Sequence, residues 1–134
     1  MKPFALTVVT PDGQAFEGMA EEVIVRTTSG DIGILADHAD CVAPLGMGRA
    51  TIVTGGEKRY ASCIGGIIFV LGGEVKLVPT TFEWAEDIDV ERAERAQQKA
   101  QSRLSKDDAS DTDIRLAQAK LHRALVRKSV ASYK

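Results

Sequence analysis

Hydrophobic residues in the first 84 positions recur in short runs that are separated by turn-forming residues. The run at residues 4–10 is rich in β-branched residues, and Pro11-Asp12-Gly13 after it has the chemistry of a tight turn. Runs at residues 15–20 and 22–27 predict another strand pair. Ser29-Gly30-Asp31 predicts the next turn, so this part of the chain is expected to form consecutive short strands.

Glycine pairs at residues 55–56 and 72–73 lie between further β-type runs. They predict hairpins, because glycine adopts a positive φ at little cost. The apolar run at residues 67–71 does not alternate with polar residues, so we expect it to be covered on both faces. Many short antiparallel strands with tight turns predict a β-sandwich or barrel.

The pattern changes to a helical period after Trp84, and glycine and proline are absent from residue 85 to the end. Asp87 or Asp89 is the candidate N-cap of a first helix, and a polar stretch at residues 106–111 separates it from a second. The residues expected on the apolar face are, in the first helix, Val90, Ala93, Ala96, Ala100 and Leu104, and in the second, Ile114, Ala117, Leu121, Ala124 and Leu125. Two helices with a short link predict an antiparallel hairpin.

The predicted fold is therefore mainly β plus α, with a β-sandwich domain at residues 1–84 and a helical hairpin at residues 85–134. The seam of the hairpin is built mainly from alanine, which stabilises far less per residue than leucine. Two interpretations of this seam are open. The hairpin leaves the sandwich or opens without unfolding it, or the alanines simply allow close and permanent packing.

Composition is that of an ordinary globular chain, with 44% hydrophobic and 27% charged residues. The net charge of −2 hides an asymmetry, because residues 1–86 carry about −5 and residues 111–134 about +4. A basic tail on an acidic body suits a nucleic acid, an acidic protein surface or the phosphates of a nucleotide, and a solvated helix face explains it equally well. With only 5% aromatic residues and acidic strands, we expect no nucleic-acid partner.

Membrane association is expected to be indirect. The longest apolar stretch, residues 63–73, is too short to cross a bilayer, and no signal peptide or transit-peptide bias is expected at the N-terminus. Cys41 and Cys63 are interpreted as small buried hydrophobes.

Few residues have the pattern of an active site. Residues 37–41 gather Asp37, His38, Asp40 and Cys41, which leaves a Cys-His nucleophile open, but a zinc site needs a further ligand and His122 lies far along the chain. No phosphate-binding loop follows the glycine pairs. We therefore predict no catalytic residue and no metal site.

The junction of the two parts has a charge pattern that suits a polyanion. Arg92 lies in the first helical turn, three residues after Asp89, and Arg123 and Arg127 share a face of the second helix. In a hairpin the three arginines converge, and guanidinium groups hold phosphate oxygens well. The simpler alternative is that Asp89 caps the helix and the arginines are solvated or paired with glutamates.

Four landmarks, in order, resemble the epsilon subunit family of F-type ATP synthases. They are Val9-Thr10-Pro11-Asp12-Gly13 with Phe16-Glu17-Gly18; Gly30-Asp31-Ile32-Gly33-Ile34-Leu35 with His38-Ala39; Gly65-Gly66 with Glu74-Val75-Lys76-Leu77; and Ala85-Glu86-Asp87-Ile88-Asp89 before an alanine- and arginine-rich hairpin. The resemblance covers essentially the whole chain. It departs at Ala36 and Asp40, where the family usually has prolines.

The resemblance implies a ten-stranded N-terminal sandwich and a C-terminal two-helix hairpin. It implies a non-catalytic rotor subunit that contacts the gamma subunit and the c-ring and inhibits ATP hydrolysis when the hairpin extends into the alpha and beta subunits of the catalytic head. The family places such a subunit on the cytoplasmic face of the bacterial cell membrane, peripherally and through the complex.

Site residues follow from the same resemblance. No cofactor is required, but ATP is a candidate regulatory ligand at Glu83, Ile88, Asp89, Arg92, Ala93, Arg123 and Arg127. The candidate partner-binding residues are Asp31, His38, Arg115, Lys120, Arg123 and Arg127. Two alternatives remain: a stand-alone ATP-sensing module that uses the same hairpin, and an enzyme centred on His38 and Cys41.

Overall fold

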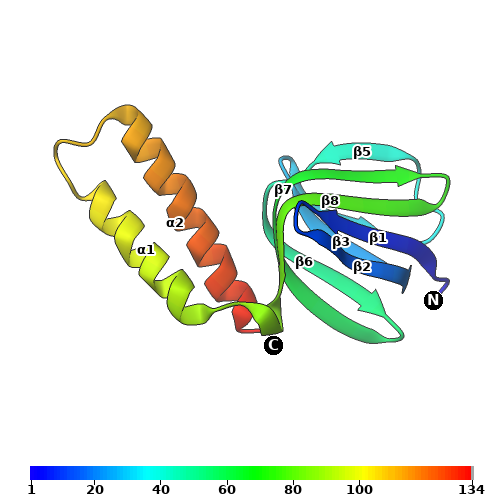
Figure 1. Ribbon diagram of the computed structural model, residues 1–134. Helices are drawn as coiled ribbons and strands as arrows, with labels where there is room; N and C mark the ends of the chain where they lie inside the picture. The colour runs from blue at the N-terminus through cyan, green and yellow to red at the C-terminus, as the bar shows by residue number, and fades with distance from the viewer. Residues whose placement is uncertain (134) are drawn as a thin grey trace. The chain divides into compact units, whose positions relative to one another are not determined.

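The computed structural model describes residues 1–133 and consists of strands followed by two helices (Figure 1). It divides into two compact units, Met1–Trp84 and Ala85–Lys134. Lys134, one of the basic residues of the last segment, lies outside the described residues.

The first unit has eight strands within the described part of the chain. They are β1 (Phe4–Thr10), β2 (Gly13–Ala20), β3 (Glu22–Thr27), β4 (Gly30–Ile34), β5 (Cys41–Pro44), β6 (Met47–Thr54), β7 (Glu57–Leu71) and β8 (Glu74–Trp84). Their order in the sheet is β2-β1-β8-β7-β6-β3-β4, and β5 pairs with β7. All pairs are antiparallel except β1 with β8.

The predicted hairpins at the glycine pairs are confirmed. Gly55 and Gly56 join β6 to β7 with φ of 59° and 79°, and Gly72 and Gly73 join β7 to β8 with φ of 58° and 81°. Positive φ at both central residues is the twist that a two-residue hairpin needs. The strand pair predicted at residues 15–20 and 22–27 is wrong as a pairing, because β2 pairs with β1 and β3 pairs with β4 and β6.

The described residues form eight strands where ten were expected. The number is lower because β7 and β8 each curve from one layer into the other and contribute a segment to both (Figure 1). Layer A contains β2, β1, residues 74–78 of β8, residues 67–71 of β7, and β5. Layer B contains residues 81–84 of β8, residues 57–64 of β7, β6, β3 and β4. Each layer therefore has five strand segments, and the sandwich class is as predicted.

The bend between the layers lies at Gly65 and Gly66, whose φ values are 67° and 94°. Before the bend Ala61 and Cys63 point into the core; after it Ile68 does, so the inward parity switches by one residue. A Cβ on Gly66 would lie 2.0 Å from the Val78 carbonyl oxygen. Only glycine fits that position, for reasons of both space and φ.

The core lies between the two layers. Its fully buried large side chains include Leu6, Ile34, Ile52 and Leu77, which come from four different strands. The expectation that residues 67–71 are covered on both faces is wrong. Ile68 and Val70 are buried, but Ile67 is 41% and Leu71 55% exposed, because β7 lies in one layer of a two-layer sandwich.

The second unit begins with a 3₁₀ turn, η1 (Ala85–Asp87), followed by α1 (Val90–Leu104) and α2 (Asp111–Ala131). Asp89 is the N-cap of α1, and its Oδ1 accepts a hydrogen bond from the Arg92 backbone N–H at 3.0 Å. Ser110 and Asp113 form a capping box at the start of α2. Within the described residues, neither helix combines the length and the apolarity that crossing a membrane requires.

The two helices pack through the predicted alanine seam. Its buried members at the interface are Ala93 and Ala100 of α1 and Ala117 and Ala124 of α2. They recur at intervals of seven residues, which keeps them on one side of each helix. Val90 and Leu125, predicted on the same faces, are instead 39% and 43% exposed.

Candidate functional site

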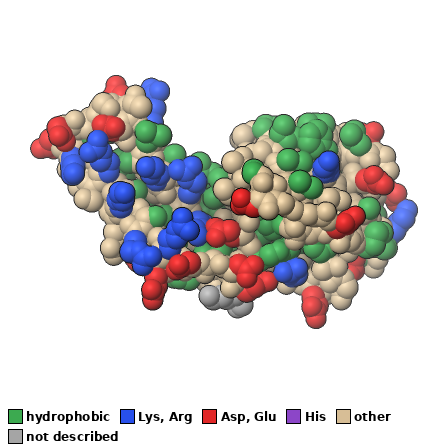
Figure 2. Space-filling model, viewed as in Figure 1, with side chains coloured by type: hydrophobic (Ala, Val, Ile, Leu, Met, Phe, Trp, Pro, Cys, Tyr) green, Lys and Arg blue, Asp and Glu red, His purple; other side chains and the backbone are tan. Residues whose placement is uncertain are grey.

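The outward surface of layer A is unusually apolar for an exposed sheet face. Alternation along paired strands brings side chains together in rows, and one row runs from Val42 to Phe69 to Lys76. Val42 is 58%, Leu71 55% and Met19 54% exposed. We call this surface the outer face; hydrophobic side chains gather over the sandwich where β5 and β7 lie (Figure 2).

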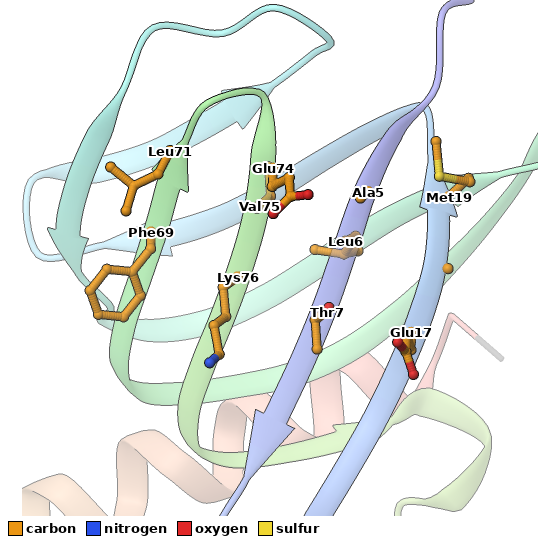
Figure 3. A pocket seen from close by; sticks show the side chains of 11 residues that line it. Ala5, Leu6, Thr7, Glu17, Met19, Phe69, Leu71, Glu74, Val75 and Lys76 are labelled. Atoms are coloured by element: carbon orange, nitrogen blue, oxygen red, sulfur yellow. The ribbon is translucent and has the colours of Figure 1, made fainter.

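An open pocket of about 670 Å³ lies on the outer face (Figure 3). Phe69 and Leu71 stand on one side of it and Met19 on the other, while Glu74, Lys76 and Glu17 supply charge. The remaining lining residues are Ala5, Leu6, Thr7, Gly18 and Val75. The outer face thus combines apolar contact area with a few fixed charges, which is the composition of a protein-binding surface. These residues were missed from the sequence because the run at residues 67–71 was assigned to the interior.

The hairpin carries two rows of charge that face one another. On α1, Arg92, Lys99 and Arg103 follow at intervals of seven and four residues and so lie in one row. On α2, Asp113, Lys120 and Arg127 follow at intervals of seven. The two rows meet at the loop end of the hairpin, where Arg103 Nη2 lies 2.9 Å from Asp113 Oδ2.

We call these two lines the basic rows. Away from the loop, no further ion pair joins the two rows among the described residues. Arg92, Lys99 and Lys120 have no ion-pair partner there. Arg123 lies four residues before Arg127, at the outer edge of the row. Lysine and arginine side chains gather accordingly on the hairpin (Figure 2). Guanidinium and ammonium groups gathered in this way have the charge that a polyanion attracts.

The other predicted ATP residues have different positions. Ile88 is 4% exposed, and Ala93 is fully buried in the seam. Asp89 lies fourteen residues before Arg103, on the same side of α1 as the basic row. Arg92 and Arg123 are exposed, and Arg127 is half-buried. The structure therefore brings Asp89, Arg92 and Arg127 to one side of the hairpin, while Arg115 lies two residues past Asp113 and faces away from the row.

Glu83 and Trp84 belong to the sandwich unit. Glu83 is half-buried on β8, opposite Ser62 of β7. The Arg59 guanidinium carbon lies 3.6 Å from the centre of the Trp84 ring, and Phe82 and Phe16 contact that ring edge-on at 5.0 and 6.3 Å between ring centroids. This cluster anchors Trp84 to the sandwich.

Asp31 and His38, the predicted partner-binding residues of the sandwich, lie apart from the pocket. The Asp31 carboxylate pairs with Arg26 Nε at 2.9 Å, and both side chains are more than half exposed. His38 lies in the loop after β4, where its Nδ1 is 2.7 Å from the Ala39 carbonyl oxygen. Asp37 beside it has a φ of 64° and pairs with Lys2 at 3.0 Å.

The His38 and Cys41 pair lacks the geometry of a nucleophilic site. The imidazole bonds its own loop, Cys41 packs against the sandwich core, and no hydrogen bond joins the two in the described residues. Burial raises the pKa of the Cys63 thiol to about 12, so that thiol is an inert core residue. No group of three or more metal-ligating side chains occurs within residues 1–133.

Both units match family models. Residues 3–85 match the β-sandwich domain of the ATP synthase delta/epsilon chain, and residues 86–132 match its long α-helix domain. ATP synthase epsilon chains of Bacillus velezensis and Ruminococcus albus are 41% and 42% identical to this chain. The Bacillus velezensis match covers 98% of each chain and the Ruminococcus albus match 100% of each.

Solved structures agree at the level of the fold. A chain of the Euglena gracilis mitochondrial ATP synthase has a TM-score of 0.83 at 21% identity, over 98% of this chain and 82% of that one. A chain of the Tetrahymena thermophila mitochondrial ATP synthase central stalk and c-ring has a TM-score of 0.66 at 13% identity, over 95% of each. The chain belongs to the ATP synthase delta/epsilon chain family.

Proposed function

We propose that this chain is a non-catalytic rotor subunit of a bacterial F-type ATP synthase, which couples the gamma subunit to the c-ring and restrains ATP hydrolysis through its hairpin. The observation that carries the proposal is the outer face of layer A. A domain of this size that leaves Val42, Leu71 and Met19 more than half exposed on one sheet face is built to be covered. This favours a subunit of a complex over a stand-alone ATP-sensing module.

The occupant we propose for the outer face is the gamma subunit. Apolar residues of β5 and β7 supply the contact area, while Lys76, Glu74 and Glu17 fix its orientation by charge. Asp31, exposed on β4, and His38, half-buried in the loop after β4, are candidates for the c-ring contact. Any membrane association is then indirect, through the complex, on the cytoplasmic face of the cell membrane.

Co-purification with gamma tests this assignment. Leu71→Asp places a charge in the apolar area. Tagged gamma should capture the native chain but not this variant. Leu116→Asp is the matched control, since Leu116 is also 55% exposed but lies on α2. Capture of Leu71→Asp at the native level would contradict the assignment of the outer face to gamma.

The ligand we propose for the basic rows is ATP. Arg92, Arg123 and Arg127 would hold the phosphates, as guanidinium groups do. Asp89 uses Oδ1 to cap α1, which leaves Oδ2 available to accept a hydrogen bond from the adenine amine. Ile88 and the buried Ala93 belong to the same unit as these residues and shape the site. ATP binding to the closed hairpin alone would stabilise that state.

Calorimetric titration of ATP into the isolated chain is the test. Arg92→Ala should lose saturable binding and keep its co-purification with gamma. Arg115→Ala removes the same charge from the far side of α2 and should bind ATP like the native chain. Equal loss in both variants would mean that net charge, and not the basic rows, attracts the nucleotide.

In the inhibitory state, we propose that the same basic side chains contact the catalytic head instead of ATP. In an extended hairpin, Arg123 and Arg127, with Arg115 and Lys120, would meet acidic segments of the alpha and beta subunits. Charge reversal at Arg123 and Arg127 should raise the rate of ATP hydrolysis by the assembled enzyme. An unchanged rate would count against their contact with the catalytic head.

A further inference from the structure

We propose that Lys128 acts as a clip that holds α2 against α1 when no nucleotide is bound, and so sets the fraction of closed hairpin on which ATP acts. The inference rests on the proposed function only for this last consequence. The clip itself follows from contacts within the hairpin.

Lys128 makes two short contacts across the hairpin. Its Nζ lies 2.7 Å from Glu94 Oε2 and 2.7 Å from Gln97 Oε1, both on α1. The Lys128 side chain is 30% and the Glu94 side chain 45% exposed, so the ion pair is partly shielded from solvent. One ammonium group therefore joins the last turns of α2 to the second turn of α1.

The clip lies on the opposite side of the seam from the basic rows. Glu94 precedes Arg103 by nine residues, which places it half a turn around α1. Lys128 follows Arg127 by one residue and is rotated by about 100° around α2. The two flanks of the hairpin thus differ: the clip attracts, whereas on the other flank Lys99 and Lys120 carry like charges that repel.

The seam between the two flanks is lightly packed. Attraction at the clip and repulsion on the other flank therefore affect how often the helices separate. The buried members of the seam include Ala93, Ala100, Ala117 and Ala124, and alanine buries little area. A helix of 15 residues such as α1 is marginal alone, so its amides exchange faster when α2 separates from it. A half-exposed ion pair with an added hydrogen bond is then enough to shift the closed fraction several-fold.

Two lysines of α2 make a matched pair of tests. In the full chain without nucleotide, Lys128→Met should raise the rate of amide hydrogen exchange in residues 90–104 about threefold to fivefold. Lys120→Met removes the same charge from a basic row and should leave that rate unchanged or lower it. The reversed pair Glu94→Lys with Lys128→Glu should restore part of the protection.

Exchange in Lys128→Met at the native rate, or equal acceleration in both lysine variants, would overturn the clip. Saturating ATP separates this result from the proposed function. If ATP slows exchange in the native chain and in Lys128→Met, nucleotide binds the closed hairpin in both, which supports the proposed function. If ATP slows exchange in neither, the nucleotide role fails while the difference between the two lysines still decides the clip.

Discussion

The sandwich and the hairpin each bury an apolar interface, but with side chains of different size. The sandwich buries Leu6, Ile52 and Leu77 at 0–1% exposure between two layers. The hairpin places Ala93 and Ala124 at 0–2% exposure between two helices. Each fully buried leucine or isoleucine contributes about 1.5–3 kcal/mol relative to exposure, and alanine well under half of that. The fold therefore joins a firmly held unit to a lightly held one.

This difference indicates which part of the chain can open without unfolding the rest. Local opening follows the regions with few buried apolar contacts. Trp84, held by Phe82, Phe16 and Arg59, is the last residue of the sandwich unit, and Ala85 begins the hairpin unit. Trp84 is also the single tryptophan, so its fluorescence reports on the sandwich, while circular dichroism at 222 nm reports mainly on the helices.

The largest effect is expected where the sandwich changes layers. Gly66→Ala forces a Cβ to within 2.0 Å of the Val78 carbonyl oxygen at a φ of 94°, so the bend has to move. We expect a loss of more than about 3 kcal/mol in the free energy of unfolding, measured by Trp84 fluorescence in urea. Gly33→Ala, with no atom within 4 Å of the new Cβ, is the control and should lose less than about 1 kcal/mol.

A core truncation compares the two units directly. Leu77→Ala removes a fully buried side chain and should cost the sandwich about 3 kcal/mol. Ala124→Gly in the seam should cost the hairpin about 1 kcal/mol, mainly through helix propensity. Both are read from urea transitions at the two signals. A shift of the Trp84 transition in Ala124→Gly comparable to that in Leu77→Ala would show that the units unfold as one.

Sequence reasoning found the parts whose signals are local. The turns at residues 55–56 and 72–73 and the seam alanines Ala93 and Ala117 follow from nearby residues, because φ preference and helical period act over a few positions. Capping chemistry narrowed the N-cap to Asp87 or Asp89, and the structure selects Asp89. The class of fold followed from the change of period after Trp84.

The parts that sequence reasoning missed depend on distant partners. The run at residues 67–71 was assigned to the interior because apolar composition does not say which neighbours cover a strand. Gly65-Gly66 served as a family landmark, but the parity switch it causes requires β7 and β8 to bend together. Whether Lys99 and Lys120 lie opposite one another depends on the register of the two helices. The Arg103–Asp113 contact fixes that register.

Acid should loosen the hairpin before the sandwich. Hydrogen bonds from the backbone and side chain of Ser110, with Arg103 nearby, lower the pKa of Asp113 from its usual 3.8. A lowered folded pKa means that this carboxylate stabilises the hairpin above about pH 4 and that the contribution is lost as the pH falls through the folded value. Helicity at 222 nm should fall in that window, and Asp113→Asn should flatten the fall while Trp84 fluorescence stays constant.

The smallest effect is expected when the hairpin is perturbed and the sandwich is observed, because opening of one unit should leave the other unchanged. Burial raises the pKa of Cys63 to about 12, so at pH 8 its thiol is neutral and reacts only when the sandwich opens. In a Cys41→Ser background, a disulfide reagent should therefore label Cys63 at a rate set by sandwich opening. Ala124→Leu overpacks the seam and should separate the helices without changing this rate. Acceleration of Cys63 labelling by Ala124→Leu would mean that the hairpin supports the sandwich core, and the contrast between a firm unit and a lightly held one would then fail.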